Sequence, residues 1–83
     1  MGRDYYGEAR EVVAALREGT ERQTGHADRI EEAISTGYTA TEILMGVRFR
    51  LGELLGDQDV SLPVPLAESI NDLARAIDQA LAT

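Results

Sequence analysis

The sequence contains no cysteine, no tryptophan and no lysine, and its only histidine is His26. Without cysteine, neither a disulfide nor a thiolate-bound metal can reinforce the core, so side-chain packing must supply the stability. A histidine-based metal or catalytic site would need His26, and the sequence offers no second nitrogen or sulfur ligand to go with it. We therefore interpret His26 as a surface residue at a helix break.

Several signatures of catalysis and membrane association are also missing. The chain has no glycine-rich phosphate loop, nucleophile elbow or paired-carboxylate motif, and Asp57-Gln58-Asp59 lacks the glycine and glutamate of a calcium loop. It has no apolar signal-peptide core, and no apolar run approaches the roughly 20 residues that cross a bilayer. We expect a cytoplasmic protein that is not an enzyme, uses no cofactor or metal and binds no membrane.

The charge that is present is mainly negative. Fifteen acidic residues outnumber eight basic residues, all of them Arg, and the net charge is −7 over 83 residues. Such a surface repels the phosphates of nucleic acids and of anionic lipids. A basic protein is therefore the favoured class of partner, and nucleic acid is disfavoured.

Apolar residues recur at three- and four-residue spacing along most of the chain, which predicts helices. We predict one all-α domain over residues 1–83, a small three- or four-helix up-and-down bundle. Its helices are expected at about 4–24, 27–36, 40–55 and 65–82. Pro65 suits the first turn of the last helix.

The first helix boundary has two interpretations. Heptad-like spacing continues from Ala9 to Ile34 with a polar middle, which is compatible with one long helix through Gly25. Glycine is costly inside a helix, however, and Asp28 offers a new N-cap with a glutamate three residues later. We therefore predict a break at residues 24–26.

The next boundary carries clearer signals. Gly37 is expected to end the helix at 27–36. Thr39-Ala-Thr-Glu42 has the pattern of a capping box, and Tyr38 is expected to pack against Ile43 as a hydrophobic staple.

The helix predicted at 40–55 has two apolar faces. The opposite side from its core face carries a stripe of Met45, Phe49 and Gly52, bordered by Glu42 and Glu53. Either a fourth helix covers this stripe or another chain binds it. Gly46 and Gly52 have no side chain, so another backbone could approach this helix closely at either position. The core face consists of Ile43, Leu44, Val47, Leu51, Leu54 and Leu55.

Acidic pairs form the second candidate surface. Glu31 and Glu32 are adjacent, and Glu68 and Asp72 are one turn apart on the last predicted helix. Such carboxylates are either a solvated face or a surface that imitates phosphates and occludes a basic cleft, such as that of a nuclease. The candidate partner-binding residues are therefore Met45, Phe49, Gly52, Glu42, Glu53, Glu31, Glu32, Glu68 and Asp72.

The segment Arg29–Leu51, RIEEAISTGYTATEILMGVRFRL, resembles stretches in small helical immunity proteins of bacterial polymorphic-toxin systems. The resemblance implies a short, acidic, cytoplasmic protein that binds a cognate toxin domain and blocks it. We therefore predict an immunity or antitoxin-type protein that neutralises a toxin by occluding its active site.

Two other functions are compatible with the sequence. A helix that ends at Gly37, followed by one that starts near Thr39, has the outline of a helix-turn-helix, which would make the chain a DNA-binding regulator with Arg48 and Arg50 as its cations. The flanking acids and the broad apolar face of the second helix argue against it. Alternatively, a second copy of the chain covers the stripe, and the chain is a structural homodimerisation module.

Overall fold

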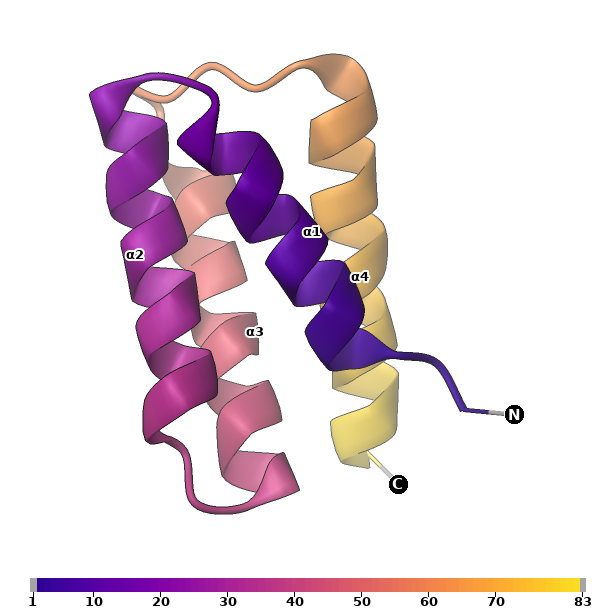
Figure 1. The fold of residues 1–83 in the computed structure, drawn as a ribbon. Coiled ribbons are helices and arrows are strands. Elements are labelled where there is room, and N and C mark those ends of the chain that lie inside the picture. Colours follow the sequence, from indigo (N-terminus) through magenta and orange to yellow (C-terminus); the bar gives the residue numbers. More distant parts are fainter. Residues whose placement is uncertain (1, 83) are drawn as a thin grey trace.

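The structure, a computed structural model, describes residues 2–82 and contains four α-helices and no strand in this range. The helices are α1 (Tyr5–Arg17), α2 (Glu21–Thr36), α3 (Ala40–Gly56) and α4 (Val64–Ala82). They run up, down, up and down (Figure 1). The prediction of a small all-α bundle is confirmed.

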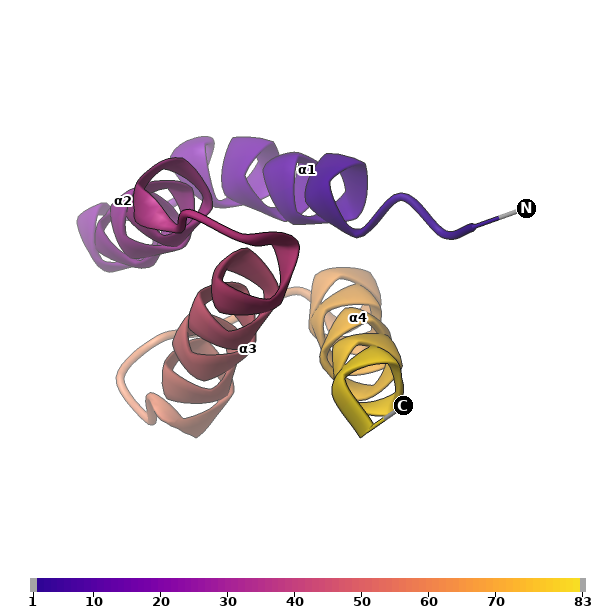
Figure 2. The same ribbon diagram turned by 90° about the horizontal axis from the view of Figure 1, so that it is seen from below.

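Each helix packs against the next one in the sequence, and α1 also contacts α4. Seen from one end, α1 and α2 lie on one side and α3 and α4 on the other (Figure 2). α1 leans across the bundle, from α4 at its N-terminal end towards α2 at its C-terminal end (Figure 1). An ion pair between Arg3 and Asp72 joins the segment before α1 to α4. Because α3 packs mainly against α2 and α4, its outer face points away from the bundle.

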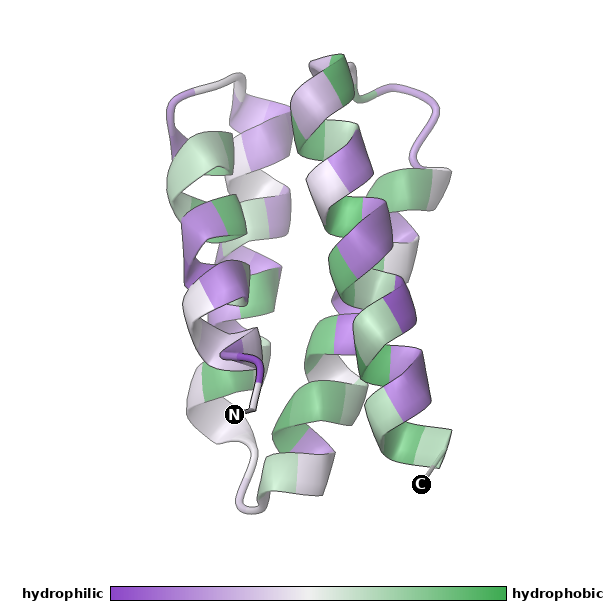
Figure 3. Ribbon diagram, turned by 90° about the vertical axis from the view of Figure 1, so that its right-hand side faces the viewer, coloured by the Kyte–Doolittle hydropathy of each residue, from purple (hydrophilic) through white to green (hydrophobic). Residues whose placement is uncertain are grey.

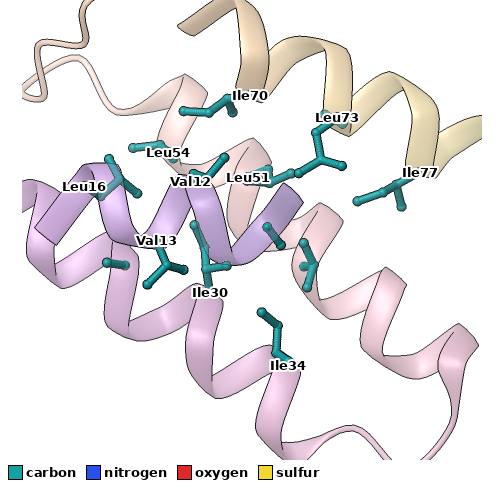
Figure 4. Packing of buried hydrophobic residues seen from close by; sticks show 14 residues of the cluster. Val12, Val13, Leu16, Ile30, Ile34, Leu51, Leu54, Ile70, Leu73 and Ile77 are labelled. Carbon is teal, nitrogen blue, oxygen red and sulfur yellow. The ribbon is translucent and has the colours of Figure 1, made fainter. Parts of the chain in front are cut away.

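The core forms where the apolar stripes of the four helices meet. Apolar and polar bands alternate along each helix (Figure 3), and the buried side chains converge between the helices (Figure 4). Each fully buried aliphatic side chain stabilises the fold by roughly 1.5–3 kcal/mol before conformational entropy is subtracted. The predicted core face of α3 is correct, with three residues fully buried and three packed at the edge. The largest fully buried side chains are Leu16, Ile30, Val47, Leu51, Leu54, Ile70, Leu73 and Ile77.

The predicted helix break at residues 24–26 is wrong, because α2 is continuous through Gly25. The chain breaks instead before Thr20, which caps α2. The Thr20 hydroxyl accepts a hydrogen bond from the Gln23 N–H, and the Gln23 side chain accepts one from the Thr20 N–H. This capping box satisfies two N–H groups at the helix start, whereas an internal glycine costs only about 1 kcal/mol. Asp28, predicted as the restart cap, lies inside α2 and binds an arginine of α1.

The turn between α2 and α3 forms where it was predicted, but by partly different contacts. Thr39 caps α3, with its hydroxyl accepting from the Glu42 N–H at 3.1 Å. Gly37 ends α2 with a φ of −72°, so it is not a left-handed cap. Its role is steric, because a Cβ there would lie 2.6 Å from Cγ1 of Ile43. Tyr38, predicted to pack against Ile43, is 94% exposed.

Candidate functional site

An exposed apolar surface lies on the outer face of α3. The side chains of Met45 and Phe49, one helical turn apart, are 57% and 61% exposed. They lie opposite the core residues of the same helix, and Gly52 continues the line as a half-buried position. In the described part of the chain, no fourth helix covers these residues. We call Met45, Phe49 and Gly52 the α3 stripe.

The two glycines of this region accommodate different neighbours. A Cβ at Gly46 would lie 3.2 Å from the Cβ of Ala33, so Gly46 allows α2 and α3 to pack closely. A Cβ at Gly52 would lie 3.2 Å from Nη1 of Arg48. The close approach expected at both glycines thus occurs at Gly46, whereas Gly52 makes room for an arginine side chain of its own helix.

A groove of about 290 Å³ lies between the outer faces of α2 and α3. Ala33 and Gly46 lie where the two helices are closest, so they form its floor. Because Phe49 belongs to both, the groove and the α3 stripe form one continuous surface. We call this hollow the α2–α3 groove. It is lined by Glu32, Ala33, Thr36, Gly37, Glu42, Gly46, Phe49 and Arg50.

The two edges of the α3 stripe differ in their charges. On the α4 side, Nε of Arg48 donates to Oδ1 of Asp78 at 2.8 Å and links α3 to α4. On the α2 side, neither Glu32 nor Glu42 forms an ion pair with any residue that the structure describes. The Glu42 carboxylate accepts only a hydrogen bond from the Thr39 hydroxyl, at 3.2 Å. On the α2 side, Glu32 and Glu42 therefore present carboxylates that form no ion pair within residues 2–82.

Arg50 is already engaged within α3. Its Nη1 donates to Oε1 of Glu53 at 2.7 Å, and its guanidinium carbon lies 5.3 Å from the centroid of the Phe49 ring. The hydrogen bond from Arg50 holds the pKa of Glu53 below its ordinary value, with smaller contributions from the positive charges of Arg50 and Arg29. Glu53, a predicted partner-binding residue, thus has an internal cationic partner.

The other predicted acids are spread over different surfaces. Glu31 binds Arg17 of α1, and Asp72 binds Arg3. Glu68 is exposed on α4 and forms no ion pair among residues 2–82. Glu31 and Asp72 therefore connect segments of the fold. Of the nine candidates, the structure brings together Glu32, Glu42 and the α3 stripe.

Sequence reasoning missed a polar cluster that joins the start of α2 to the segment between α3 and α4. Oδ2 of Asp57 accepts hydrogen bonds from Nε of Arg22 at 2.8 Å and from Nε2 of His26 at 2.7 Å. Its Oδ1 accepts from the Asp59 N–H at 3.0 Å. The hydrogen bonds from Arg22 and then His26 hold the pKa of Asp57 well below its ordinary value. His26 is only 4% exposed, so its interpretation as a surface residue is wrong.

Gln23 completes this cluster. Its Nε2 donates to the carbonyl of Ser61 at 2.6 Å, while its Oε1 accepts from the Thr20 N–H at 2.9 Å. One signal in the sequence pointed here: in the heptad-like register from Ala9 to Ile34, Gln23 occupies an inward position. The start of α2 thus binds the segment after α3 at both Asp57 and Ser61. We call Arg22, Gln23, His26 and Asp57 the connector cluster.

The helix pair α2–α3 does not have the shape of a helix-turn-helix. The turn joins one end of the pair and the Arg22–Asp57 ion pair joins the other, so the two helices lie antiparallel along their lengths (Figure 1). In a helix-turn-helix, the two helices cross at about 90–120°. Arg48 and Arg50, the cations available to phosphates, each bind a carboxylate of this chain. Neither feature supports the DNA-binding alternative.

No protein-family model, curated protein or solved structure matches the chain. Within the described residues, no helix is both long and apolar enough to span a bilayer. The same residues contain no group of three or more His, Cys, Asp or Glu side chains placed to hold a metal ion. The candidate site is therefore defined by its own geometry: an exposed apolar stripe that continues into an acidic groove.

Proposed function

We propose that this chain is a non-enzymatic, protein-binding domain of the immunity or antitoxin type, which neutralises a cognate toxin in the cytoplasm by covering its active site. The main support is the exposure of Met45 and Phe49 beside carboxylates that lack a cation. Contiguous exposed apolar patches mark interaction sites, and methionine and aromatic residues are enriched at protein interfaces. A net charge of −7 favours a basic partner.

Neutralisation by occlusion assigns a separate role to each part of this surface. Glu32 and Glu42 would pair with cations around the toxin's active site, in place of the phosphates or other anions of its substrate. Met45 and Phe49 would supply the desolvated centre of the contact, where most binding energy is concentrated. All four residues lie within Arg29–Leu51, the segment that resembles immunity proteins. None of these roles requires a catalytic group, a cofactor or a metal.

Affinity capture from the native host, followed by mass spectrometry, tests the proposal. The wild-type chain and the double variant Met45→Ser/Phe49→Ser serve as baits. We expect the wild type to capture a basic protein in stoichiometric amount and the variant to lose it. Val64→Ser is the matched control, since Val64 is 68% exposed but lies on α4, away from the stripe.

The captured protein is then purified and its activity measured with and without the chain. Neutralisation predicts loss of that activity when the wild type is added and retention when the double variant is added. If both baits capture the same proteins, the α3 stripe is not the binding surface. If the captured protein stays fully active in the complex, the chain is not its inhibitor.

Light scattering over a range of concentrations separates this proposal from homodimerisation, which the exposed stripe also permits. A chain that stays monomeric and still captures the partner supports the proposal. A dimer that dissociates when Met45 and Phe49 are replaced by Ser would show that a second copy covers the stripe.

A further inference from the structure

We infer that the docking element of the partner is a basic amphipathic helix that lies along the α2–α3 groove. It places apolar side chains on Met45 and Phe49 and an arginine or lysine between the carboxylates of Glu32 and Glu42. This inference rests on the proposed function, because it names the part of the partner that fits the proposed surface.

The position of the docking helix follows from the difference between the two flanks of α3. On the α4 flank, the Arg48–Asp78 ion pair bridges the two helices. This pair spans the gap between α3 and α4, so a helix docking there would have to displace it, whereas the Arg50–Glu53 pair beside the α2 flank lies within α3 alone. On the α2 flank, Ala33 and Gly46 form a shallow floor under an open volume of about 290 Å³. The docking element therefore lies on the α2 side of the stripe.

The helical form of the occupant follows from the shape of this surface. Two antiparallel helices present a long groove, and the side-chain ridge of a third helix packs into such a groove. Met45 and Phe49 are one turn apart, so apolar side chains one turn apart on a helix that lies along α3 would contact both of them. Binding of an extended peptide by strand addition would need an unpaired sheet edge, and residues 2–82 form no strand.

The positive charge of the occupant follows from the partners of each nearby ionic group. Arg50 is bound to Glu53 and lies against Phe49, so it is not available to an incoming carboxylate. Glu32 and Glu42 line the groove without a cation among the described residues. An arginine or lysine placed between them would gain charge-assisted hydrogen bonds, while an acidic side chain would be repelled.

A designed peptide tests this inference without knowledge of the host partner. The probe is a fluorescein-labelled helix of about 18 residues, roughly five turns, with leucines at i, i+4, i+7 and i+11 flanked by arginines. The control peptide has glutamate in place of each arginine. Binding is measured by fluorescence anisotropy at about 150 mM salt, where long-range attraction between exposed charges is largely screened.

We expect the variant Glu32→Arg/Glu42→Arg to bind the basic peptide at least about tenfold more weakly than wild type. Glu32→Gln/Glu42→Gln should weaken binding by a smaller factor. The matched control, Glu11→Arg/Glu68→Arg, changes the net charge equally but lies on α1 and α4, and should change affinity less than about twofold. Circular dichroism confirms that each variant is folded.

Three outcomes would overturn the inference: no binding of the basic peptide, equal weakening by the two Arg double variants, or equal binding of the acidic peptide. Amide chemical-shift changes must also fall on the α2–α3 groove, and changes confined to α1 and α4 would count against it. A host partner that depends on Met45 and Phe49 but not on Glu32 and Glu42 would refute the basic helix and leave neutralisation through the α3 stripe standing. If the basic peptide binds in the α2–α3 groove but no host protein depends on Met45 and Phe49, the inferred docking helix would stand and the proposed function would fail.

Discussion

The connector cluster and the α2–α3 groove lie at opposite ends of the same helix pair. The polar groups of the first are paired within the chain, and the carboxylates of the second form no ion pair in the part of the chain that the structure describes. At the connector cluster, the Asp57 carboxylate accepts three hydrogen bonds and His26 is buried. At the groove, Glu32 and Glu42 have no cationic partner among the described residues and lie beside an exposed aromatic ring. The first arrangement is complete within the chain, whereas the second leaves two carboxylates without an ion pair within residues 2–82, as the proposed docking of a partner requires. The difference separates residues that hold the fold from residues available for recognition.

Mutations at the two ends of the α2–α3 pair should therefore have different consequences. The segment between α3 and α4 has no regular secondary structure over most of its length. The connector cluster therefore fixes this segment through side chains of α2. Substitutions in the connector cluster should change stability and leave the groove's affinity intact, while substitutions in the groove and stripe should do the opposite. Three predictions test this division, from the largest expected change in stability to the smallest.

Gln23→Ala should have the largest effect. It removes the partner of the Ser61 carbonyl and half of the capping box at Thr20. Losing these two part-buried hydrogen bonds and half of the cap should together lower the free energy of unfolding by about 1–3 kcal/mol. Urea denaturation measures this loss. Gln79→Ala, at an exposed position of α4, should change stability by less than about 0.5 kcal/mol. Similar losses in both variants would contradict the assigned role of Gln23.

Asp57→Asn should lower the melting temperature at neutral pH by several degrees and flatten the response of stability to acid. The folded-state pKa of Asp57 lies below its ordinary value of 3.8. Between these two pKa values, the unfolded chain therefore binds more protons at Asp57 than the folded chain does. The contribution of Asp57 is therefore fully present above about pH 5 and decreases as the pH falls below about 4. Thermal melts from pH 7 to pH 2 measure this.

The difference between the two proteins isolates Asp57 from the other carboxyl groups that titrate in acid. Wild type should lose its advantage over Asp57→Asn as the pH falls, so the two melting temperatures should converge. Parallel curves over the whole pH range would show that the Asp57 carboxylate does not supply the difference. Binding of the basic peptide at neutral pH should be the same for both proteins.

Met45→Ser/Phe49→Ser should have the smallest effect on stability, although it is the variant expected to lose its partner. Both side chains are more than half exposed, so the free energy of unfolding should change by less than about 1 kcal/mol. Leu51→Ala on the buried face of the same helix should cost about 2–5 kcal/mol. A loss in the stripe variant as large as in Leu51→Ala would show that the stripe is part of the core.

The sequence was sufficient for the parts of the fold that depend on local periodicity. The spacing of apolar residues correctly divides α3 into a core face and an outer stripe. Thr39 caps α3 as predicted, but the capping box does not close, because the Glu42 carboxylate bonds the Thr39 hydroxyl and not the Thr39 N–H. The same reasoning misplaced the start of α2, because Gly25 was given more weight than the capping pair of Thr20 and Gln23. The glycine and the capping pair are both local signals, and the packing of α2 decides which of them determines the start of the helix.

Contacts between residues far apart in sequence could not be predicted in this way. His26 and Asp57 are 31 positions apart, and their hydrogen bond leaves no periodic trace. The same holds for the acids of the candidate site. No local pattern indicates that Glu31 would bind Arg17 while Glu32, its neighbour, would line a groove. Periodicity identified the stripe, but only the arrangement of the four helices shows that it is uncovered.

Gly46 connects the stability of the fold to the shape of the surface that would meet a partner. Its missing Cβ sets the distance between α2 and α3, and an added methyl group would lie 3.2 Å from Ala33. Such a methyl would push the helices apart by a few tenths of an ångström and make the α2–α3 groove both wider and shallower. The absence of a side chain at position 46 thus determines how wide a helix the proposed groove can accept. Gly46→Ala, which adds one methyl group, would change which helices fit it.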